Sequence, residues 1–171
     1  MSEIKQYIRD IPDFPEEGIL FKDITPLLKD FANFKRAIKK LVVHYREVDF
    51  DYIAAIESRG FLIGTPMALE MEKGFIPIRK PGKLPAEVVR VSYELEYGKN
   101  TLEMHCDAIS PGNRVLIVDD LLATGGTTSA AIQLIEKLDG EVVGTGFLLE
   151  LEELRGREKL KGYEVFSLLK D

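Results

Sequence analysis

Cysteine and long apolar runs are the scarcest features of this chain of 171 residues. The single Cys106 rules out an internal disulfide framework and suits the reducing cytoplasm. No apolar run approaches the ~20 residues that a helix needs to cross a membrane. The charged N-terminus has no apolar core of a secretion signal. We therefore expect a cytoplasmic protein that has no membrane partner.

Positive charge is also in deficit, because 23 Lys and Arg residues stand against 29 Asp and Glu residues. The resulting net charge of −6 argues against a surface that binds nucleic acid. Hydrophobic residues make up 45% of the chain, enough for a real core at this length. Since no repeat or linker divides the sequence, residues 1–171 are expected to form a single domain.

One segment, from Arg114 to Ser129, is more informative than the rest of the chain. Val115 to Val118 is a continuous apolar run, typical of a strand that is buried on both faces of a parallel sheet. The run ends on two acids, and a Thr- and Gly-rich turn follows before the apolar spacing of a helix. Ligands of α/β proteins bind at this edge of the sheet. The segment therefore predicts a binding site.

The turn and the acids suit two different parts of one ligand. Paired glycines let several backbone N–H groups point into one concavity, and a helix start adds its dipole, so the turn suits a phosphate. Asp119 and Asp120 would repel that phosphate and better suit vicinal hydroxyls, or a metal that those hydroxyls hold. A sugar with cis hydroxyls and a terminal phosphate satisfies both parts.

Apolar patterns around this segment predict alternating strands and helices. Continuous runs predict core strands at residues 52–56, 75–78, 115–118 and, as the last one, 142–149. Helical spacing predicts helices at residues 4–8, 61–71 and 129–138, and one more that Asn33 can cap. Val91 and Tyr93 alternate with polar residues, as do Leu102 and Met104, which predicts an antiparallel hairpin. The expected fold is α/β, a doubly wound, mostly parallel sheet with an inserted hairpin.

Basic residues follow two of the predicted strands. Glu57-Ser58-Arg59-Gly60 comes after the first strand, and Arg79, Lys80 and Lys83 come after the second. The carboxyl ends of neighbouring parallel strands meet at one edge, so these cations should converge. Arginine suits bidentate contact with phosphate. The loops therefore predict a pyrophosphate site.

The segment Val115–Thr127 resembles the phosphoribosyl-pyrophosphate (PRPP) motif of the type I phosphoribosyltransferases. Four more segments lie in the same order as in one branch of that class, the adenine phosphoribosyltransferases: residues 12–28, 57–61, 78–87 and 93–99. The segments PDFPEEGILFKDITPLL and YELEYGK distinguish this branch from other purine and pyrimidine members. The resemblance implies transfer to adenine from PRPP, assisted by Mg²⁺, giving AMP and pyrophosphate. It also implies a homodimer.

The resemblance also implies roles for individual residues on the sugar-phosphate side. The ribose 5-phosphate would be held by the turn, namely Ala123, Thr124, Gly125, Gly126 and Thr127. Asp119 and Asp120 would take the two ribose hydroxyls, directly or through the metal. Pyrophosphate would be received by three cations, Arg59, Arg79 and Lys83.

On the base side, residues 1–30 would form an N-terminal helix and a hood, with Leu20, Phe21 and Lys22 enclosing the adenine. Glu96 would be the general acid/base at the purine ring nitrogens, and Tyr97 would lie near the leaving pyrophosphate. Residues 80–105 would provide a lid loop, at 83–90, and the hairpin flap. Apart from the resemblance, Ile11 to Leu28 is rich in proline and predicts irregular structure.

Two alternatives remain open at this point. The chain could act on another nucleobase, whose oxygen-rich ring usually needs side-chain donors above it. It could instead be a regulator that senses PRPP without catalysis, although such a protein would be expected to lack the acid at Glu96 and to carry a DNA-binding domain. Other features predict ordinary roles. His44 is expected to be structural, His105 and Cys106 lack a second metal-ligating pair, and the charged run from Glu150 to Lys161 predicts a solvated helix.

Overall fold

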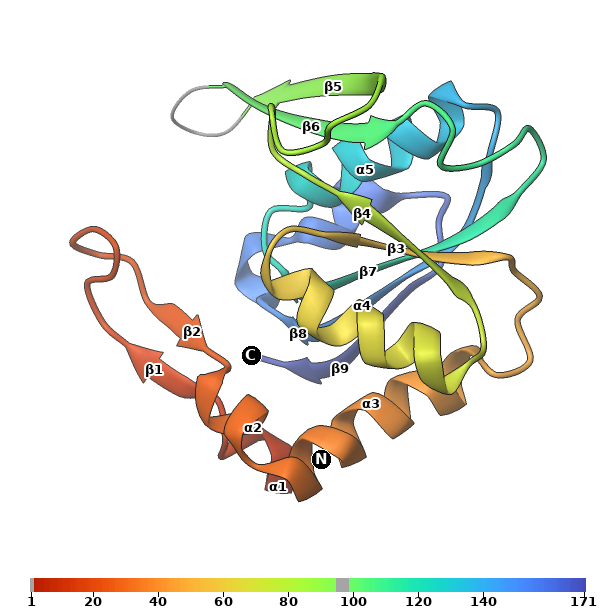
Figure 1. Ribbon diagram of the computed structural model, residues 1–171. Coiled ribbons are helices and arrows are strands. Elements are labelled where there is room, and N and C mark those ends of the chain that lie inside the picture. The colour runs from red at the N-terminus through yellow and green to blue at the C-terminus, as the bar shows by residue number, and fades with distance from the viewer. Residues whose placement is uncertain (1, 95–98) are drawn as a thin grey trace.

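The computed structural model describes residues 2–94 and 99–171. Its centre is a parallel sheet of five strands in the order β4-β3-β7-β8-β9 (Figure 1). The strands are β3 (Tyr52–Ile56), β4 (Gly74–Ile78), β7 (Arg114–Leu122), β8 (Glu141–Glu150) and β9 (Val165–Lys170). The sheet confirms the predicted α/β class. It has one strand more than predicted, because β9 follows the strand expected to be the last.

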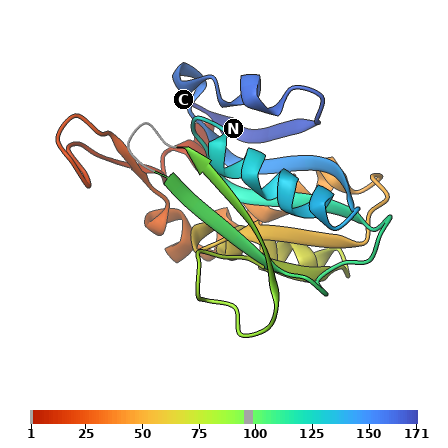
Figure 2. The ribbon, with the colours of Figure 1, turned by 90° about the horizontal axis from the view of Figure 1, so that it is seen from above.

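Helices cover both faces of the sheet (Figures 1 and 2). Leu116 and Val118 of β7 face the core beneath α3 (Phe31–Tyr45) and α4 (Arg59–Glu70). Val115 and Ile117 face the opposite core, which α5 (Gly126–Lys137) covers. Side chains alternate across a strand, so a strand covered on both faces is apolar at every position. This is why the apolar run in β7 was readable from the sequence.

Strand β7 is longer than predicted and includes both acids. It continues to Leu122, and its parallel pairing with β8 reaches Leu122 opposite Glu150. Asp119 and Asp120 are therefore in the last part of the strand, not after it. Their backbone is fixed by the sheet, and the turn begins at Ala123.

The N-terminal segment is more regular than its prolines indicated. After α1 (Ser2–Lys5), β1 (Arg9–Ile11) and β2 (Phe21–Asp23) form an antiparallel hairpin, and α2 (Thr25–Lys29) follows. The prediction of irregular structure over residues 11–28 was wrong for β2 and α2. The cap of α3 also differs from prediction, since Asp30 accepts from the N–H of Asn33 at 2.9 Å. Figure 1 shows the hairpin projecting from the body of the molecule.

The inserted hairpin is confirmed. It consists of β5 (Val88–Glu94) and β6 (Lys99–His105), with Val91 opposite Leu102 and Val89 opposite Met104. Val91, Leu102 and Met104 are buried in the core that contains α5. Residues 88–90 of the predicted lid belong to β5, because their backbones pair with β6.

The chain after β8 is not the solvated helix that its charges predicted. It forms two short 3₁₀ helices, η1 (Glu152–Leu154) and η2 (Gly156–Leu160), before β9. Arg155, between them, has a left-handed backbone (φ 50°), which ends regular helix there. Gly156 and Leu160 are buried. Within the described part of the chain, no helix is both long and apolar enough to span a membrane.

Candidate active site

The site lies where the sheet changes winding direction. The chain runs from β3 through α4 to β4 on one side, and from β7 through α5 to β8 on the other. The loops after β3 and β7 therefore separate at the carboxyl edge of the sheet, where α/β proteins bind ligands. A cleft of about 420 Å³ opens there. Its lining is Phe21, Ile56, Glu57, Ser58, Arg59, Lys80, Asp119, Asp120, Leu121 and the run from Ala123 to Thr128.

The turn after β7 has the geometry of an anion-binding site. Gly125 is the N-cap of α5 and has a positive φ of 77°, which glycine adopts without steric cost. The first N–H groups of a helix have no partner within it, and the turn directs the start of α5 toward the cleft. Thr124 and Thr127 line the same cleft, and the Tyr93 hydroxyl lies 3.2 Å from Oγ1 of Thr127. The structure thus brings together all five predicted phosphate-binding residues.

The two acids lie side by side at the floor of this cleft. Asp120 is 4% exposed, and its Oδ2 is 3.0 Å from Nε of Arg59. The arginine N–H is not aligned with that oxygen, so Oδ2 accepts no hydrogen bond from the described residues. Asp119 Oδ1 accepts from the backbone N–H of Asp120 at 2.8 Å. A Cβ on Gly60 would lie 2.7 Å from the same Oδ1, so glycine lets α4 begin against the carboxylate.

Both carboxyl groups have raised pKa values. Burial raises the pKa of Asp119 well above its usual range, and the neighbouring charge of Asp120 adds to the effect. Burial also raises the pKa of Asp120, although the Arg59 guanidinium opposes the shift. Two desolvated acids at one place favour a ligand that supplies hydroxyl donors or positive charge.

Only part of the predicted hood faces the cleft. Phe21 lines it, and the Arg59 guanidinium lies 4.9 Å from the centre of the Phe21 ring. Leu20 is half-exposed and is not among the lining residues. The Lys22 side chain is buried and turns away to pair with Asp10 and Asp171. Lys22 approaches the site through its backbone, since its carbonyl accepts from Nη1 of Arg59 at 3.3 Å.

Of the three cations predicted to receive pyrophosphate, only Arg59 lines the cleft, and Lys80 of the same basic cluster lines it although it was not among the three. Nε of Arg79 lies instead 2.6 Å from the Glu57 carboxylate, and Lys83 is exposed outside the cleft. Consecutive side chains near a strand end point to opposite sides, so the sequence could identify the basic cluster but not which cation enters the site. Ser58 and Thr128 also line the cleft, and the predicted residue set did not include them. Both residues lie beside glycine-containing turns, and those turns were the sequence signal that could have identified them as cleft residues.

Glu96 and Tyr97 lie outside the described residues. The strands that lead to them are described, and they place the hairpin against α5. Lys137 Nζ donates to the Arg90 carbonyl at 2.7 Å, and Tyr93 reaches Thr127. The roles of the two residues stay predictions.

Mg²⁺ is chemically compatible with the cleft. In the described ranges no group of three or more His, Cys, Asp or Glu side chains is placed to hold a metal. Asp119 and Asp120 could supply at most two carboxylates, and no residue that the structure describes donates a hydrogen bond to Oδ2 of Asp120. Mg²⁺ usually keeps several waters and binds one or two carboxylates together with substrate phosphates. The donors present therefore fit a magnesium ion that is held largely by its substrate.

The sheet, the hairpin and the glycine-rich turn after β7 together define a class of protein. The family described as "Phosphoribosyl transferase domain" matches residues 27–171. A curated relative, the adenine phosphoribosyltransferase of Halothermothrix orenii, is 65% identical over 169 residues, covering 99% of both chains. The crystal structure of adenine phosphoribosyltransferase from Thermoanaerobacter pseudethanolicus matches with a TM-score of 0.98 at 55% identity, covering 99% of both chains. The Saccharomyces cerevisiae adenine phosphoribosyltransferase, complexed with an imino-altritol bisphosphate and adenine, matches with a TM-score of 0.93 at 43% identity, covering 98% of this chain and 97% of that one.

The chain belongs to the adenine phosphoribosyltransferase family. The resemblance found in the sequence motifs is thereby confirmed over the whole chain.

Proposed function

We propose that this protein transfers the 5-phosphoribosyl group of PRPP to adenine, forming AMP and pyrophosphate in purine salvage. The observation that carries the proposal is one cleft that holds an anion-binding turn, two desolvated carboxylates and an aromatic face. The chain is also 65% identical to a curated adenine phosphoribosyltransferase over its full length.

The turn and the acids would fix the ribose. Backbone N–H groups and hydroxyls of residues 123–127 bind the 5-phosphate, and Asp119 and Asp120 accept from the two ring hydroxyls. With both ends of the ribose held, its anomeric carbon has one position and one orientation. Such positioning can supply a large part of a rate enhancement.

The departing pyrophosphate needs positive charge where negative charge develops. Arg59 and Lys80 line the cleft and can provide it, and such preorganised stabilisation is typically the largest catalytic contribution. Mg²⁺, held by Asp119, Asp120 and substrate oxygens, would act as a Lewis acid on the phosphate oxygens. Arg79 and Lys83 stay proposed pyrophosphate ligands, and reaching the cleft would require Arg79 to leave Glu57.

The base would bind under the hood, with the Phe21 ring against the purine and the backbone near Leu20 and Lys22 reading its edge. Glu96 would exchange the proton at the ring nitrogen, and Tyr97 would contact the leaving group. The loop at residues 83–87 would serve as a lid that excludes water, which would otherwise hydrolyse PRPP. A homodimer and a cytoplasmic location complete the proposal, the latter supported by the single Cys106.

The test mixes purified protein with PRPP, Mg²⁺ and one nucleobase at a time, and the mononucleotide is measured. Adenine should be converted with a kcat/KM more than about tenfold above that for hypoxanthine or guanine, a discrimination of ~1.4 kcal/mol. Comparable rates with those bases would favour the alternative nucleobase. PRPP binding without turnover of any base would favour the sensing regulator.

A further inference from the structure

The chain after β8 lies directly behind the phosphate-binding turn. A Cβ added to Gly156 would overlap the carbonyl oxygen of Ala123 and lie 3.1 Å from the backbone nitrogen of Gly125. A Cβ added to Gly125 would in turn overlap the carbonyl oxygen of Gly156. The two backbones are thus in contact at the residue whose positive φ shapes the turn.

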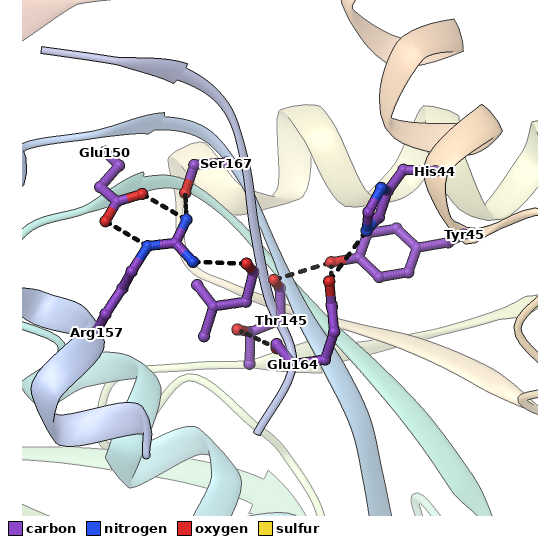
Figure 3. A network of polar contacts seen from close by, with 8 residues as sticks. His44, Tyr45, Thr145, Glu150, Arg157, Glu164 and Ser167 are labelled. Atoms are coloured by element: carbon purple, nitrogen blue, oxygen red, sulfur yellow. Dashed lines mark hydrogen bonds and ion pairs between the residues drawn. The ribbon is translucent and has the colours of Figure 1, made fainter. Parts of the chain in front are cut away.

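Arg157, the next residue, fastens this segment to the sheet (Figure 3). Its Nε and Nη2 donate to the two carboxylate oxygens of Glu150 at 2.6 and 2.7 Å. Nη1 donates to the carbonyl of Val165 at 2.7 Å, and Nη2 lies 3.3 Å from Oγ of Ser167. Glu150 is 3% exposed, at the end of β8. The guanidinium therefore joins η2 to both β8 and β9.

The segment is held a second time, against α5. Leu160 is buried in the same core as Ala131 and Ile135 of α5. The Tyr163 hydroxyl donates to Glu136 of α5 at 2.5 Å. The residues 156–163 are thus attached to both elements that flank the phosphate-binding turn, the sheet before it and the helix after it.

We propose that Gly156 and Arg157 are positioning residues for the ribose 5-phosphate, acting as a rear wall that holds residues 123–127 in their anion-binding conformation. The proposal rests on the proposed function, in which that turn binds the 5-phosphate. Neither residue lines the cleft, so both act through the backbone of the turn. A turn that binds through N–H groups depends on its backbone geometry, because the donors have no side-chain freedom with which to compensate.

The chemistry of the two residues makes the wall specific. Gly156 must lack a side chain, since any Cβ would displace the Ala123 carbonyl or the tail itself. Arg157 must offer a planar fork, since it binds both oxygens of Glu150 and a carbonyl at once. Lysine keeps the charge but cannot reproduce that bidentate geometry. Arg157→Lys is therefore a milder perturbation than Gly156→Ala, and both affect the same turn.

The experiment compares Gly156→Ala and Arg157→Lys with Gly74→Ala. In the control, a Cβ on Gly74 would lie 2.7 Å from Cδ1 of Tyr52 at the start of β4, away from the cleft. Steady-state kinetics give KM separately for PRPP and adenine, calorimetry gives the dissociation constant of ribose 5-phosphate, and thermal unfolding gives Tm.

We expect Gly156→Ala to raise both the KM for PRPP and the dissociation constant of ribose 5-phosphate by about tenfold or more, since small misplacements of positioning groups can cost up to ~100-fold. Arg157→Lys should raise both by a smaller factor, and the KM for adenine should change less than twofold. Gly74→Ala should lower Tm without changing either KM.

The proposal is overturned if Gly156→Ala and Arg157→Lys lower Tm as Gly74→Ala does and leave ribose 5-phosphate binding unchanged. It is also overturned if both KM values rise equally, which would indicate general loosening. If Gly156→Ala does not fold, Arg157→Lys alone decides between these outcomes. A parent protein that binds ribose 5-phosphate but lacks transferase activity would contradict the proposed function and leave the rear wall testable by binding.

Discussion

At the scale of single residues, the paired acids show the conflict between binding and stability. Asp119 and Asp120 are kept desolvated and adjacent, and this arrangement raises both pKa values. A carboxyl whose pKa is raised on folding contributes stability below its unfolded pKa and loses it as pH rises through the folded pKa. We therefore expect ionisation of the pair to weaken the ligand-free protein, and a bound ligand to offset that cost.

Asp119→Asn should stabilise the ligand-free protein by about 1 kcal/mol at pH 7, the usual gain when a strained site is relieved. The gain should shrink as the pH is lowered and be lost below about 4, where the carboxyl of the unfolded parent also takes up a proton. Urea unfolding at pH 7 and at about pH 3 measures the difference, with the exposed Asp107→Asn as control. The KM for PRPP should rise in the same variant. Loss of stability at pH 7, or an unchanged KM, would contradict the ribose-hydroxyl role.

The family resemblance of the hairpin motif predicts that Glu96 transfers the proton at the purine ring. General acid/base groups typically contribute ~10²–10⁴-fold. Glu96→Gln should therefore lower kcat at least about 100-fold and leave PRPP binding nearly unchanged. Pre-steady-state turnover and PRPP titration measure the two effects. A kcat of the variant within a few-fold of the parent value would contradict the acid/base role of Glu96.

The contacts of the Lys22 side chain could not be predicted from the sequence. The motif correctly brings residue 22 near the cleft, but its ammonium is buried against Asp10 and Asp171. Asp171 is distant in sequence, and no local pattern encodes such a pairing. The same holds for Arg157 and Glu150, which meet only because η2 folds back onto the end of β8.

At the scale of elements, the N-terminal hairpin β1–β2 depends on few attachments. Among the described residues, its polar contacts to the α/β body are the ion pair between Lys22 and Asp171 and the contact of Arg59 with the Lys22 carbonyl. Lys22 is 7% exposed and also pairs with Asp10 of β1 at 2.9 Å. The pKa of Asp171 is lowered, mainly by its hydrogen bond from Lys22, so the pair is charged at neutral pH. We therefore expect this pair to fix the position of the β1–β2 hairpin, the proposed hood, relative to the cleft.

Lys22→Met should raise the KM for adenine by several-fold up to about tenfold, because the hood loses its fixed position and preorganisation. The KM for PRPP should change less, and Lys22→Arg should retain most of the adenine affinity. Lys5→Met is the matched control, since Lys5 pairs with the same Asp171 at 2.5 Å but belongs to α1. Equal effects of Lys5→Met and Lys22→Met on adenine would mean that the hood is positioned by other contacts.

Element prediction succeeded where a periodic pattern was strong. Apolar runs or alternating apolar residues, which arise because one or both faces of an element are buried, predicted β3, β4, β7, α4, α5 and the β5–β6 hairpin. β2 and the 3₁₀ helices are three to five residues long, too short for any period to emerge. The tail 150–161 was misjudged because its charges are not all solvated: Glu150 and Arg157 satisfy each other.

At the scale of the whole molecule, the position of the site was predictable and its supports were not. Alternating strands and helices imply a sheet that winds in two directions, and the acids and glycines mark the carboxyl edge at which it divides. The rear wall, the anchoring of the hood and the strand β9 all depend on the C-terminal segment. The contacts of that segment with the phosphate turn and with Lys22 join residues that are far apart in the sequence, so no local pattern encodes them.

Self-association is the remaining property at this scale. Large apolar side chains are exposed on the two helices that cover one face of the sheet: Phe31 at 76%, Val43 at 67%, Leu62 at 44% and Leu69 at 77%. Leu62 and Leu69 are seven residues apart on α4, so they lie on the same side of that helix. Large apolar side chains that are exposed on the same side of one helix can contribute to a contact surface. We therefore infer that the proposed homodimer forms through the side of α4 that carries Leu62 and Leu69.

Leu69→Glu places a charge on this side of α4 and should convert the dimer to a monomer, since burying an unpaired carboxylate is strongly unfavourable. Sedimentation equilibrium of the parent should give twice the chain mass of 19.3 kDa, and the variant should give that mass once. Leu154→Glu, at an exposed leucine of η1, is the control and should remain dimeric. A monomeric parent would contradict the homodimer itself. A dimeric Leu69→Glu variant would instead place the contact elsewhere, because a charge at a residue that is 77% exposed in the single chain costs little unless a second copy covers it.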